Sequence, residues 1–221
     1  GCARATPLPA VTPHEARLIW RECPASDDWQ QVQACFGERP PQPTEVEALR
    51  YGERLDRGQR LRVGSETIVA RAYPIPLLLP ILPDLYVLTR NGRPLAALWG
   101  HMETYEPSIS LQIIAGQVTW EFADPYQATI IYGDRDLRNV YGLEAAYSPY
   151  ELAGKLMFVG RLAGHYVLIY DGRQVGPTFD QVTIAYCCEI MLYAPRGGEG
   201  RYRFWGEREG QRIVVEVSSG A

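Results

Sequence analysis

The chain has 221 residues, of which 46% are hydrophobic and 11% aromatic, and a formal net charge of −4. This length and hydrophobic content are enough to bury a core without a metal or other staple. The acidic balance argues against a nucleic-acid partner, because a nucleic-acid-binding protein normally presents a basic face.

The first thirteen residues predict a tether that carries a lipid anchor. The chain opens with Gly1-Cys2 and continues through a Pro- and Thr-containing stretch to Pro13. This start is similar to the mature end of a bacterial lipoprotein, in which the lipid-bearing Cys follows the small residue of the signal cleavage site. We therefore expect residues 1–13 to be exposed, Cys2 to be the lipid attachment site, and the protein to be extracytoplasmic and lipid-anchored, with no other membrane contact. An ordinary thiol at Cys2 in a truncated chain is the alternative.

Residues 14–83 predict a small mixed N-terminal region. Ser26 or Asp27 can cap a short helix through Ala34. Residues Thr44 to Glu47 have the spacing of a capping box, which predicts a second helical turn.

A hairpin is predicted next, from the alternating residues 60–63, the Gly64-Ser65 turn and residues 67–70. The apolar, proline-rich segment Tyr73 to Leu85 is too short to span a bilayer, which takes about 20 residues. We interpret it as an extended linker and place a domain boundary after residue 83.

Residues 84–221 predict a domain of β-hairpin repeats. Ala115-Gly116 and Ala153-Gly154 each begin a similar six-residue pattern that ends in Trp120 and Phe158, and a third copy begins at Gly200 and contains Phe204. We expect these three aromatic residues to occupy equivalent positions, because a single hairpin cannot bury its own apolar face.

Three dipeptides in this domain predict hairpin turns, namely Asn91-Gly92, Asp171-Gly172 and Glu209-Gly210. The fold class is therefore mainly β, built of antiparallel hairpin repeats. Either a partial β-propeller-like array or a β-sandwich satisfies the pattern.

Five cysteines leave an even number once Cys2 is set aside. Cys23 and Cys35 are close enough in sequence to close a small loop, and we expect a disulfide there. Cys187 and Cys188 are neighbours. Either a strained vicinal disulfide joins them, or they are two small apolar residues that point to opposite faces of a strand.

The last third of the chain resembles a set of uncharacterised bacterial extracytoplasmic proteins. The matching segments are Gly154 to Val159, Tyr166 to Asp180, Tyr186 to Glu189 and Gly200 to Gly206. The resemblance implies no activity. It does imply that Cys187, Cys188 and Glu189 form a deliberate vicinal cysteine site.

Motifs that would indicate catalysis are missing from the sequence, which has no nucleophile elbow, phosphate loop or dinucleotide fingerprint. Of the three histidines, His14 falls in the tether and His165 beside a turn, and only His101 has a neighbouring ligand, Glu103. We expect no metal site, no cofactor and no catalytic residue.

A carboxylate pair of a glycosidase can hide among Glu103, Glu106 and Glu121, because sequence spacing does not report spatial separation. Trp99, Trp120 and Trp205 either form a binding face or pack between sheets.

These observations predict a non-enzymatic, membrane-anchored extracytoplasmic β domain that binds a protein, peptide or glycan ligand or serves an envelope interaction. The alternative is a secreted carboxylate-dependent glycan hydrolase. A pocket with two carboxyl groups and a raised pKa on one of them would favour the hydrolase.

Overall fold

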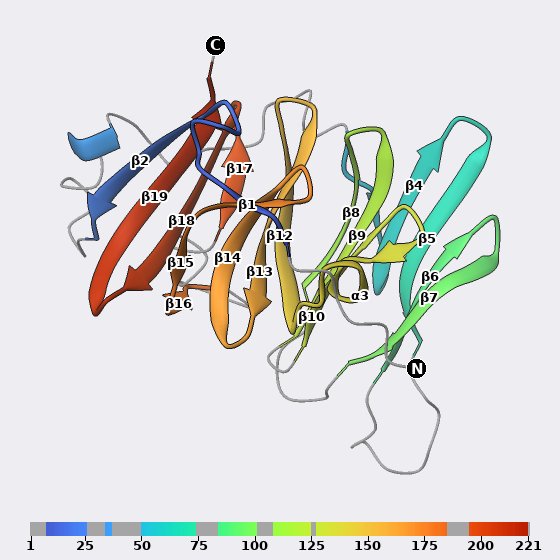
Figure 1. Ribbon diagram of the computed structural model, residues 1–221. Coiled ribbons are helices and arrows are strands. Elements are labelled where there is room, and N and C mark those ends of the chain that lie inside the picture. The colour runs from blue at the N-terminus through green and yellow to red at the C-terminus, as the bar shows by residue number, and fades with distance from the viewer. Residues whose placement is uncertain are drawn as a thin grey trace.

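The computed structural model describes residues 8–25, 34–36, 50–73, 84–100, 108–124, 127–184 and 195–220. Within these ranges the protein is mainly β, as predicted, and its strands form four sheets, numbered I to IV in chain order (Figure 1). Neighbouring strands run antiparallel, except that β1 (Ala10–Val11) runs parallel to β15. The longest helix in the described part is α3, Leu137–Tyr141.

The first two sheets are antiparallel meanders. Sheet I contains, in spatial order, β3 (Glu53–Leu55), β4 (Gly58–Val63), β5 (Glu66–Tyr73), β6 (Leu85–Arg90) and β7 (Arg93–Trp99). Sheet II contains β8 (Ser108–Ile114), β9 (Gln117–Ala123), β10 (Ala128–Tyr132) and β11 (Arg135–Asp136).

The last two sheets each take in a strand from the N-terminal part of the chain. Sheet III contains β12 (Ala145–Leu152), β13 (Lys155–Leu162), β14 (His165–Tyr170) and β15 (Arg173–Phe179), with β1 beside β15. Sheet IV contains β16 (Gln181–Val182), β18 (Arg201–Arg208), β19 (Gln211–Ser219) and β2 (Leu18–Pro24), with β17 (Arg196–Gly198) paired to β18.

Two-residue turns ending in glycine join most of these strands. Both residues of each turn have positive φ, the geometry of a type I′ turn, which matches the twist of the flanking strands. The three predicted turns are confirmed, and so is the Gly64-Ser65 turn between β4 and β5. Such turns in the described ranges are Asn91-Gly92, Ala115-Gly116, Ala153-Gly154, Ala163-Gly164, Asp171-Gly172, Glu199-Gly200 and Glu209-Gly210.

The four sheets stack face to face in a row (Figure 1). Side chains alternate between the two faces of each strand, so one strand supplies two interfaces. On β13, for example, Phe158 packs toward sheet II, whereas Met157 and Val159 pack toward sheet IV. The described part of the chain is thus a layered, sandwich-like β structure with its apolar clusters between the layers.

The three aromatic residues singled out by the repeat lie at matching places. Each lies four residues after its turn glycine and is buried. Trp120 packs between sheets I and II, Phe158 between sheets II and III, and Phe204 between sheets III and IV. Each ring therefore fills the interface with the preceding sheet. Whether the three units superpose remains a prediction.

The domain boundary expected after residue 83 does not separate two sheets. Strand β5 precedes it and β6 follows it, yet the two are paired along their length in sheet I. Strand β2 pairs with β19 at the other end of the sequence. The mixed region 14–83 is therefore not a separate unit, because its strands complete sheets I and IV. The expected helix before Ala34 lies largely outside the described residues, which show a helical turn at 34–36.

Part of the expected tether is paired with a strand. Ala10 and Val11 pair with Gln174 and Val175, and the carbonyl of Pro9 accepts a hydrogen bond from Gln174. The open edge of β15 supplies these partners, and Val11 also packs against the apolar cluster between sheets III and IV. Residues 8–13 are therefore docked on sheet III, and the rest of the expected tether lies outside the described residues.

Candidate functional site

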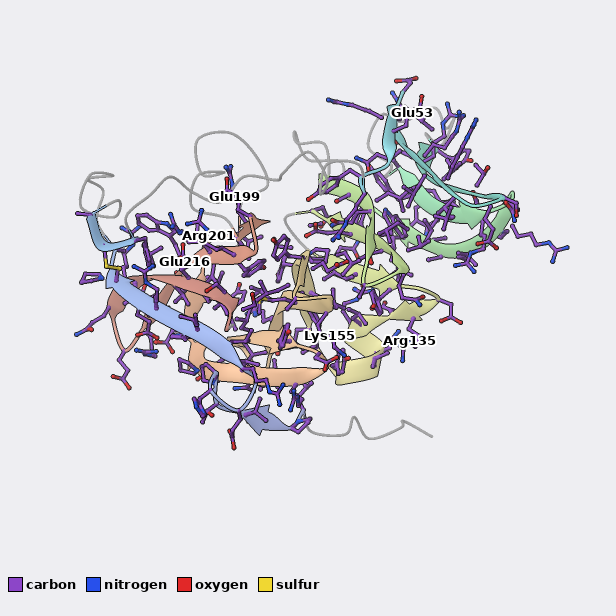
Figure 2. The ribbon with its side chains drawn as sticks, turned by 90° about the horizontal axis from the view of Figure 1, so that it is seen from above. Glu53, Arg135, Lys155, Glu199, Arg201 and Glu216 are labelled. Atoms are coloured by element: carbon purple, nitrogen blue, oxygen red, sulfur yellow. A yellow bond between two sulfur atoms is a disulfide. The ribbon has the colours of Figure 1, made fainter. Side chains whose placement is uncertain are left out.

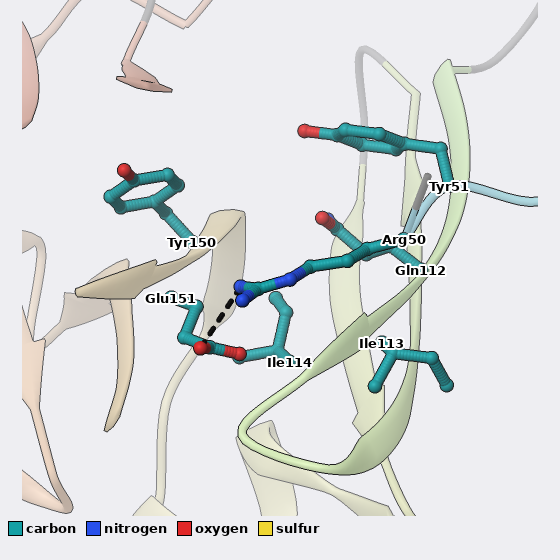
Figure 3. Close-up of a pocket in the computed structure, with 7 residues that line it drawn as sticks. All are labelled: Arg50, Tyr51, Gln112, Ile113, Ile114, Tyr150 and Glu151. Atoms are coloured by element: carbon teal, nitrogen blue, oxygen red, sulfur yellow. Dashed lines mark ion pairs between the residues drawn. The ribbon is translucent and has the colours of Figure 1, made fainter. Parts of the chain in front are cut away.

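A shallow cleft with a cavity volume of about 10 Å³ opens at the junction of sheets II and III (Figure 3). This is roughly the space that one water molecule needs and far below the 300–1,000 Å³ of typical small-molecule sites, so the cleft suits one functional group of a ligand rather than a whole enclosed molecule. Its lining comes from three separate parts of the chain: Arg50 and Tyr51, residues 112–114 of β8, and residues 150–151 of β12.

Short backbone contacts place Arg50 and Tyr51 beside β8. Tyr51 forms an isolated antiparallel bridge with Gln112, the N–H of Ile113 donates to the carbonyl of Arg50 at 2.9 Å, and the N–H of Gly52 donates to the carbonyl of Leu111 at 2.6 Å. A side chain at Gly52 would come within 3.0 Å of the carbonyl oxygen of Arg60. Glycine therefore allows the chain to touch β8 before entering sheet I.

The charged groups of the cleft are an arginine and a glutamate that neutralise each other. Nη1 of Arg50 lies 2.9 Å from Oε1 of Glu151, and Oε2 of Glu151 accepts the backbone N–H of Ala115 at 2.6 Å. Figure 3 shows the guanidinium of Arg50 reaching across the cleft to this carboxylate. Both carboxylate oxygens are thus engaged, which fixes Glu151 and leaves other guanidinium N–H groups of Arg50 available to a ligand.

Two tyrosine rings flank Arg50 on either side of the cleft (Figure 3). Tyr51 is 37% exposed, whereas Tyr150 is buried. The ring of Tyr150 stacks on Tyr202 with centroids 5.9 Å apart, and its hydroxyl accepts the N–H of Gly200 at 3.2 Å. Tyr150 is therefore a rigid wall, and Tyr51 offers an accessible aromatic face.

A half-buried carboxylate, that of Glu121, lies near this wall. Strand β12 carries a bulge between Tyr147 and Tyr150, and Ser148 there has a left-handed φ of 52°. The N–H of Ser148 donates to Oε1 of Glu121 at 2.5 Å, and its carbonyl accepts the Tyr202 hydroxyl at 2.8 Å. The bulge thus turns both backbone groups of Ser148 toward polar side chains of the adjacent sheets.

The surroundings raise the pKa values of the Glu121 and Tyr202 side chains. Burial raises the pKa of Glu121 to about 7, and the Ser148 hydrogen bond opposes the shift only in part. Burial, followed by the nearby charge of Glu121, holds the pKa of Tyr202 well above its ordinary value of 10. Of the acids named from the sequence as a carboxylate pair, Glu121 therefore has the raised pKa of a general acid.

Glu121 does not itself line the cleft, and the described lining contains no pair of carboxylates. Among the described residues that line the cleft, Glu151 is the one acid, and it is paired with Arg50. Glu103 and Glu106 lie outside the described residues. A hydrolase would need a pocket with two carboxyl groups, one of them with a raised pKa. The described residues supply a raised pKa near the cleft but no carboxylate pair in it.

The expected disulfide is confirmed. Cys23 and Cys35 are bonded, and their Cα atoms are 6.3 Å apart (Figure 2). The other predicted cysteine sites, Cys2 and the group Cys187, Cys188 and Glu189, lie outside the described residues.

The histidines and tryptophans named from the sequence differ in their exposure. His14 is exposed, and His165 is exposed at the start of β14 with its Nδ1 3.6 Å from Asp180. His101 lies outside the described residues. Trp120 and Trp205 are buried between or against sheets, as the packing interpretation expects, whereas Trp99 is 53% exposed.

The described residues contain no group of three His, Cys, Asp or Glu side chains that could hold a metal ion. None of their helices has the length and apolar character needed to cross a bilayer.

Sequence reasoning missed the cleft. Arg50, Gln112 and Glu151 come from segments far apart in the chain, and none of them stands in a motif. Their juxtaposition depends on the bridge between Tyr51 and Gln112 and on the packing of sheet II against sheet III, neither of which leaves a local signal. No family model and no curated protein sequence matches this chain.

Proposed function

We propose that the chain is a non-enzymatic, membrane-anchored extracytoplasmic β domain, and that the cleft between sheets II and III binds its ligand. One observation carries this proposal: the described lining combines Tyr51, which is 37% exposed, with an Arg50–Glu151 pair whose carboxylate is already engaged. Such groups recognise hydroxyl, amide or carboxylate groups by hydrogen bonding and stacking, and they leave no free base for hydrolysis.

The compartment is supported by the chain's chemistry. The Cys23–Cys35 disulfide suits an oxidising environment outside the cytoplasm. The resemblance of the last third to extracytoplasmic proteins favours the same location. We accordingly expect a lipid at Cys2, and mass spectrometry of the native protein extracted from membranes tests it. An unmodified Cys2 would overturn the lipid anchor.

We also infer that the hairpins beginning at Gly116, Gly154 and Gly200 are copies of one unit. The support is the common placement of Trp120, Phe158 and Phe204, each in the interface with the preceding sheet. An experimental structure in which the three hairpins superpose with overlapping rings would bear this out, and rings on opposite faces would refute it.

Ligand binding is tested by NMR titration of the ¹⁵N-labelled chain. The probes are soluble chito-oligosaccharides and a set of short peptides, which cover the glycan and peptide classes. We expect one class to shift the amides of Tyr51, Gln112 and Glu151. Arg50→Ala and Tyr51→Ala should weaken that binding about tenfold or more, because each removes a direct contact in a small site. Val140→Ser, at an exposed position in α3, is the matched control.

The hydrolase alternative has one observation in its favour, the raised pKa of Glu121. Incubating the chito-oligosaccharides with the chain and analysing them by mass spectrometry separates the two functions. Shorter products that disappear with Glu121→Gln would establish hydrolysis. Amide shifts at the cleft with intact oligosaccharides would support binding, whereas a lack of shifts at the cleft with every probe would refute this site.

A further inference from the structure

Sheet I ends the row of sheets, and its outer face has no sheet packed on it in the described structure (Figure 1). Its inner face carries Leu61, Ile68 and Leu88, which are buried against sheet II. Cross-strand partners share a face, so the pairing register identifies the outer residues. One row across the outer face is Tyr73, Leu85 and Trp99, and the next is Arg71, Val87 and Ala97.

The apolar side chains of this outer face are unusually exposed. Trp99 is 53% exposed, Tyr73 47% and Leu95, at the bulge of β7, 38%. These are half of the large apolar residues that are exposed in the described ranges, and they lie on β5 and β7 of one sheet, on either side of β6. A contiguous group of this kind marks an interaction surface more often than scattered exposed residues do.

Arginines accompany the apolar residues on the same face. The pairing register places Arg60, Arg62 and Arg71 there, with Glu53 opposite Arg60 at 4.0 Å. Among the described residues of this face, three arginines against one glutamate give a positive balance, although the whole chain has a net charge of −4. Figure 2 shows Glu53 at this end of the molecule, well away from Arg135 on sheet II.

The opposite end of the row is covered. On the outer face of sheet IV, Phe36 and the disulfide cysteine Cys23 pack on Trp205 and Val214. The guanidinium of Arg203 lies over the Phe36 ring at 4.6 Å and pairs with the carboxylate of Glu216. Apolar and cationic side chains are thus also present at that end, but there they pack on one another within the chain.

We propose that the outer face of sheet I docks directly on a lipid bilayer that contains anionic headgroups. Tyrosine and tryptophan favour the headgroup level of a membrane, a leucine can enter the acyl boundary, and arginines close to the surface are attracted to anionic lipids. A second copy of the chain fits this face less well, because pairing it with itself would bring two positive surfaces together. The contact goes beyond ligand binding in the cleft and does not depend on it.

The test uses the full chain with Cys2→Ser, so that no acyl chain contributes. Vesicles of phosphatidylcholine alone and of phosphatidylcholine with 30% phosphatidylglycerol, roughly the composition at which surface charge attracts basic segments, are compared by co-flotation. We expect binding to the anionic vesicles, weakened about tenfold or more by Arg62→Glu with Arg71→Glu and by high salt. Trp99→Ser should weaken it to a similar degree by removing the inserted ring.

Two variants on sheet II and α3 serve as matched controls. Arg135→Glu reverses an exposed charge and Val140→Ser removes an exposed apolar side chain away from the outer face of sheet I. Both should bind as the parent does, and unchanged thermal unfolding of every variant excludes misfolding. Absence of flotation, or equal loss in the control variants, would overturn the proposal. A dimer in light scattering that Trp99→Ser dissociates, without vesicle binding, would assign the face to a second copy instead.

Discussion

At the scale of single residues, several turns carry a side chain where the backbone disfavours one. Ala163 and Gly164 join β13 to β14 with φ of 50° and 82°. The left-handed conformation costs an ordinary residue roughly 1 kcal/mol, whereas asparagine adopts it more readily. Asn91 shows the favourable case, since its side-chain oxygen also accepts the N–H of Thr67 at 2.8 Å.

We therefore predict that Ala163→Asn stabilises the protein. Ala163 is exposed, so the change removes no packing. The free energy of unfolding should rise by about 0.5–1 kcal/mol in urea titrations. Asn91→Ala is the matched control and should lower it by at least as much, because it also removes the Thr67 hydrogen bond. No gain at Ala163 would contradict the assignment of turn strain.

The second prediction at this scale concerns Glu121. Its pKa is raised to about 7 in the folded chain, against 4.5 for an ordinary glutamate. The folded protein therefore holds a proton between these values that the unfolded chain has released. This contribution to stability is fully present below pH 4.5 and is lost as the pH rises through 7.

Stability should accordingly fall between pH 4.5 and 7.5 by about 1–3 kcal/mol from this group, the lower figure applying where solvent reaches the carboxyl. Glu121→Gln cannot ionise, so subtracting its urea-derived unfolding free energies from those of the parent isolates the effect. Parallel pH profiles for the two proteins would show that Glu121 is ionised with an ordinary pKa.

At the scale of elements, the disulfide fastens the helical turn 34–36 to sheet IV. It joins residues separated by 12 positions and places Phe36 over the sheet. Closing a loop of this size in the unfolded chain is worth about 3 kcal/mol. Phe36 adds contacts of its own, with the guanidinium groups of Arg203 at 4.6 Å and Arg21 at 5.3 Å from its ring centre.

Replacing both cysteines by serine should lower the free energy of unfolding by about 3 kcal/mol. Dithiothreitol should have a similar effect on the parent protein and none on the double variant, which separates this bond from the other cysteines. Phe36→Ala in the oxidised protein measures the covering contacts alone. If the double variant matched the parent in urea, the bond would not constrain the unfolded chain.

Elements also show where sequence reasoning succeeds. A turn such as Asp171-Gly172 is encoded by its own two residues, and the strands beside it by alternation, so both were predictable. The Cys23–Cys35 bond was predictable because its loop is short. The partners of β1 and β2 were not, because an edge such as that of β15 accepts any suitable strand and leaves no mark in the sequence of either.

At the scale of the whole molecule, the row of sheets explains why the cleft escaped prediction while the fold class did not. Each interface is built from alternate residues of strands in two successive sheets, and a mainly β pattern follows from that alternation. The cleft instead depends on how sheet II sits against sheet III and on the short contact of Tyr51 with Gln112. The pKa of Glu121 is likewise raised by burial, and sequence spacing does not report burial.

A row of layers, in which each sheet packs on its neighbours, also predicts uneven stability. Trp120 is fully buried in the interface of sheets I and II, and that interface is the one through which sheet I is held. Trp120→Ala should cost about 3–5 kcal/mol of local packing. Sheet I is the terminal layer, so the loss should release it while the later layers keep their own interfaces.

Hydrogen–deuterium exchange tests this directly. In Trp120→Ala we expect the amides of β5 and β6 to lose protection by about 100-fold or more, while those of β14 and β19 keep theirs. Phe158→Ala, in the interface of sheets II and III, is the matched control and should lower protection in β10 and β13. Equal loss of protection in all four sheets with either variant would show that the layers unfold as one cooperative unit, because the free energy of one interface would then be shared by the whole row.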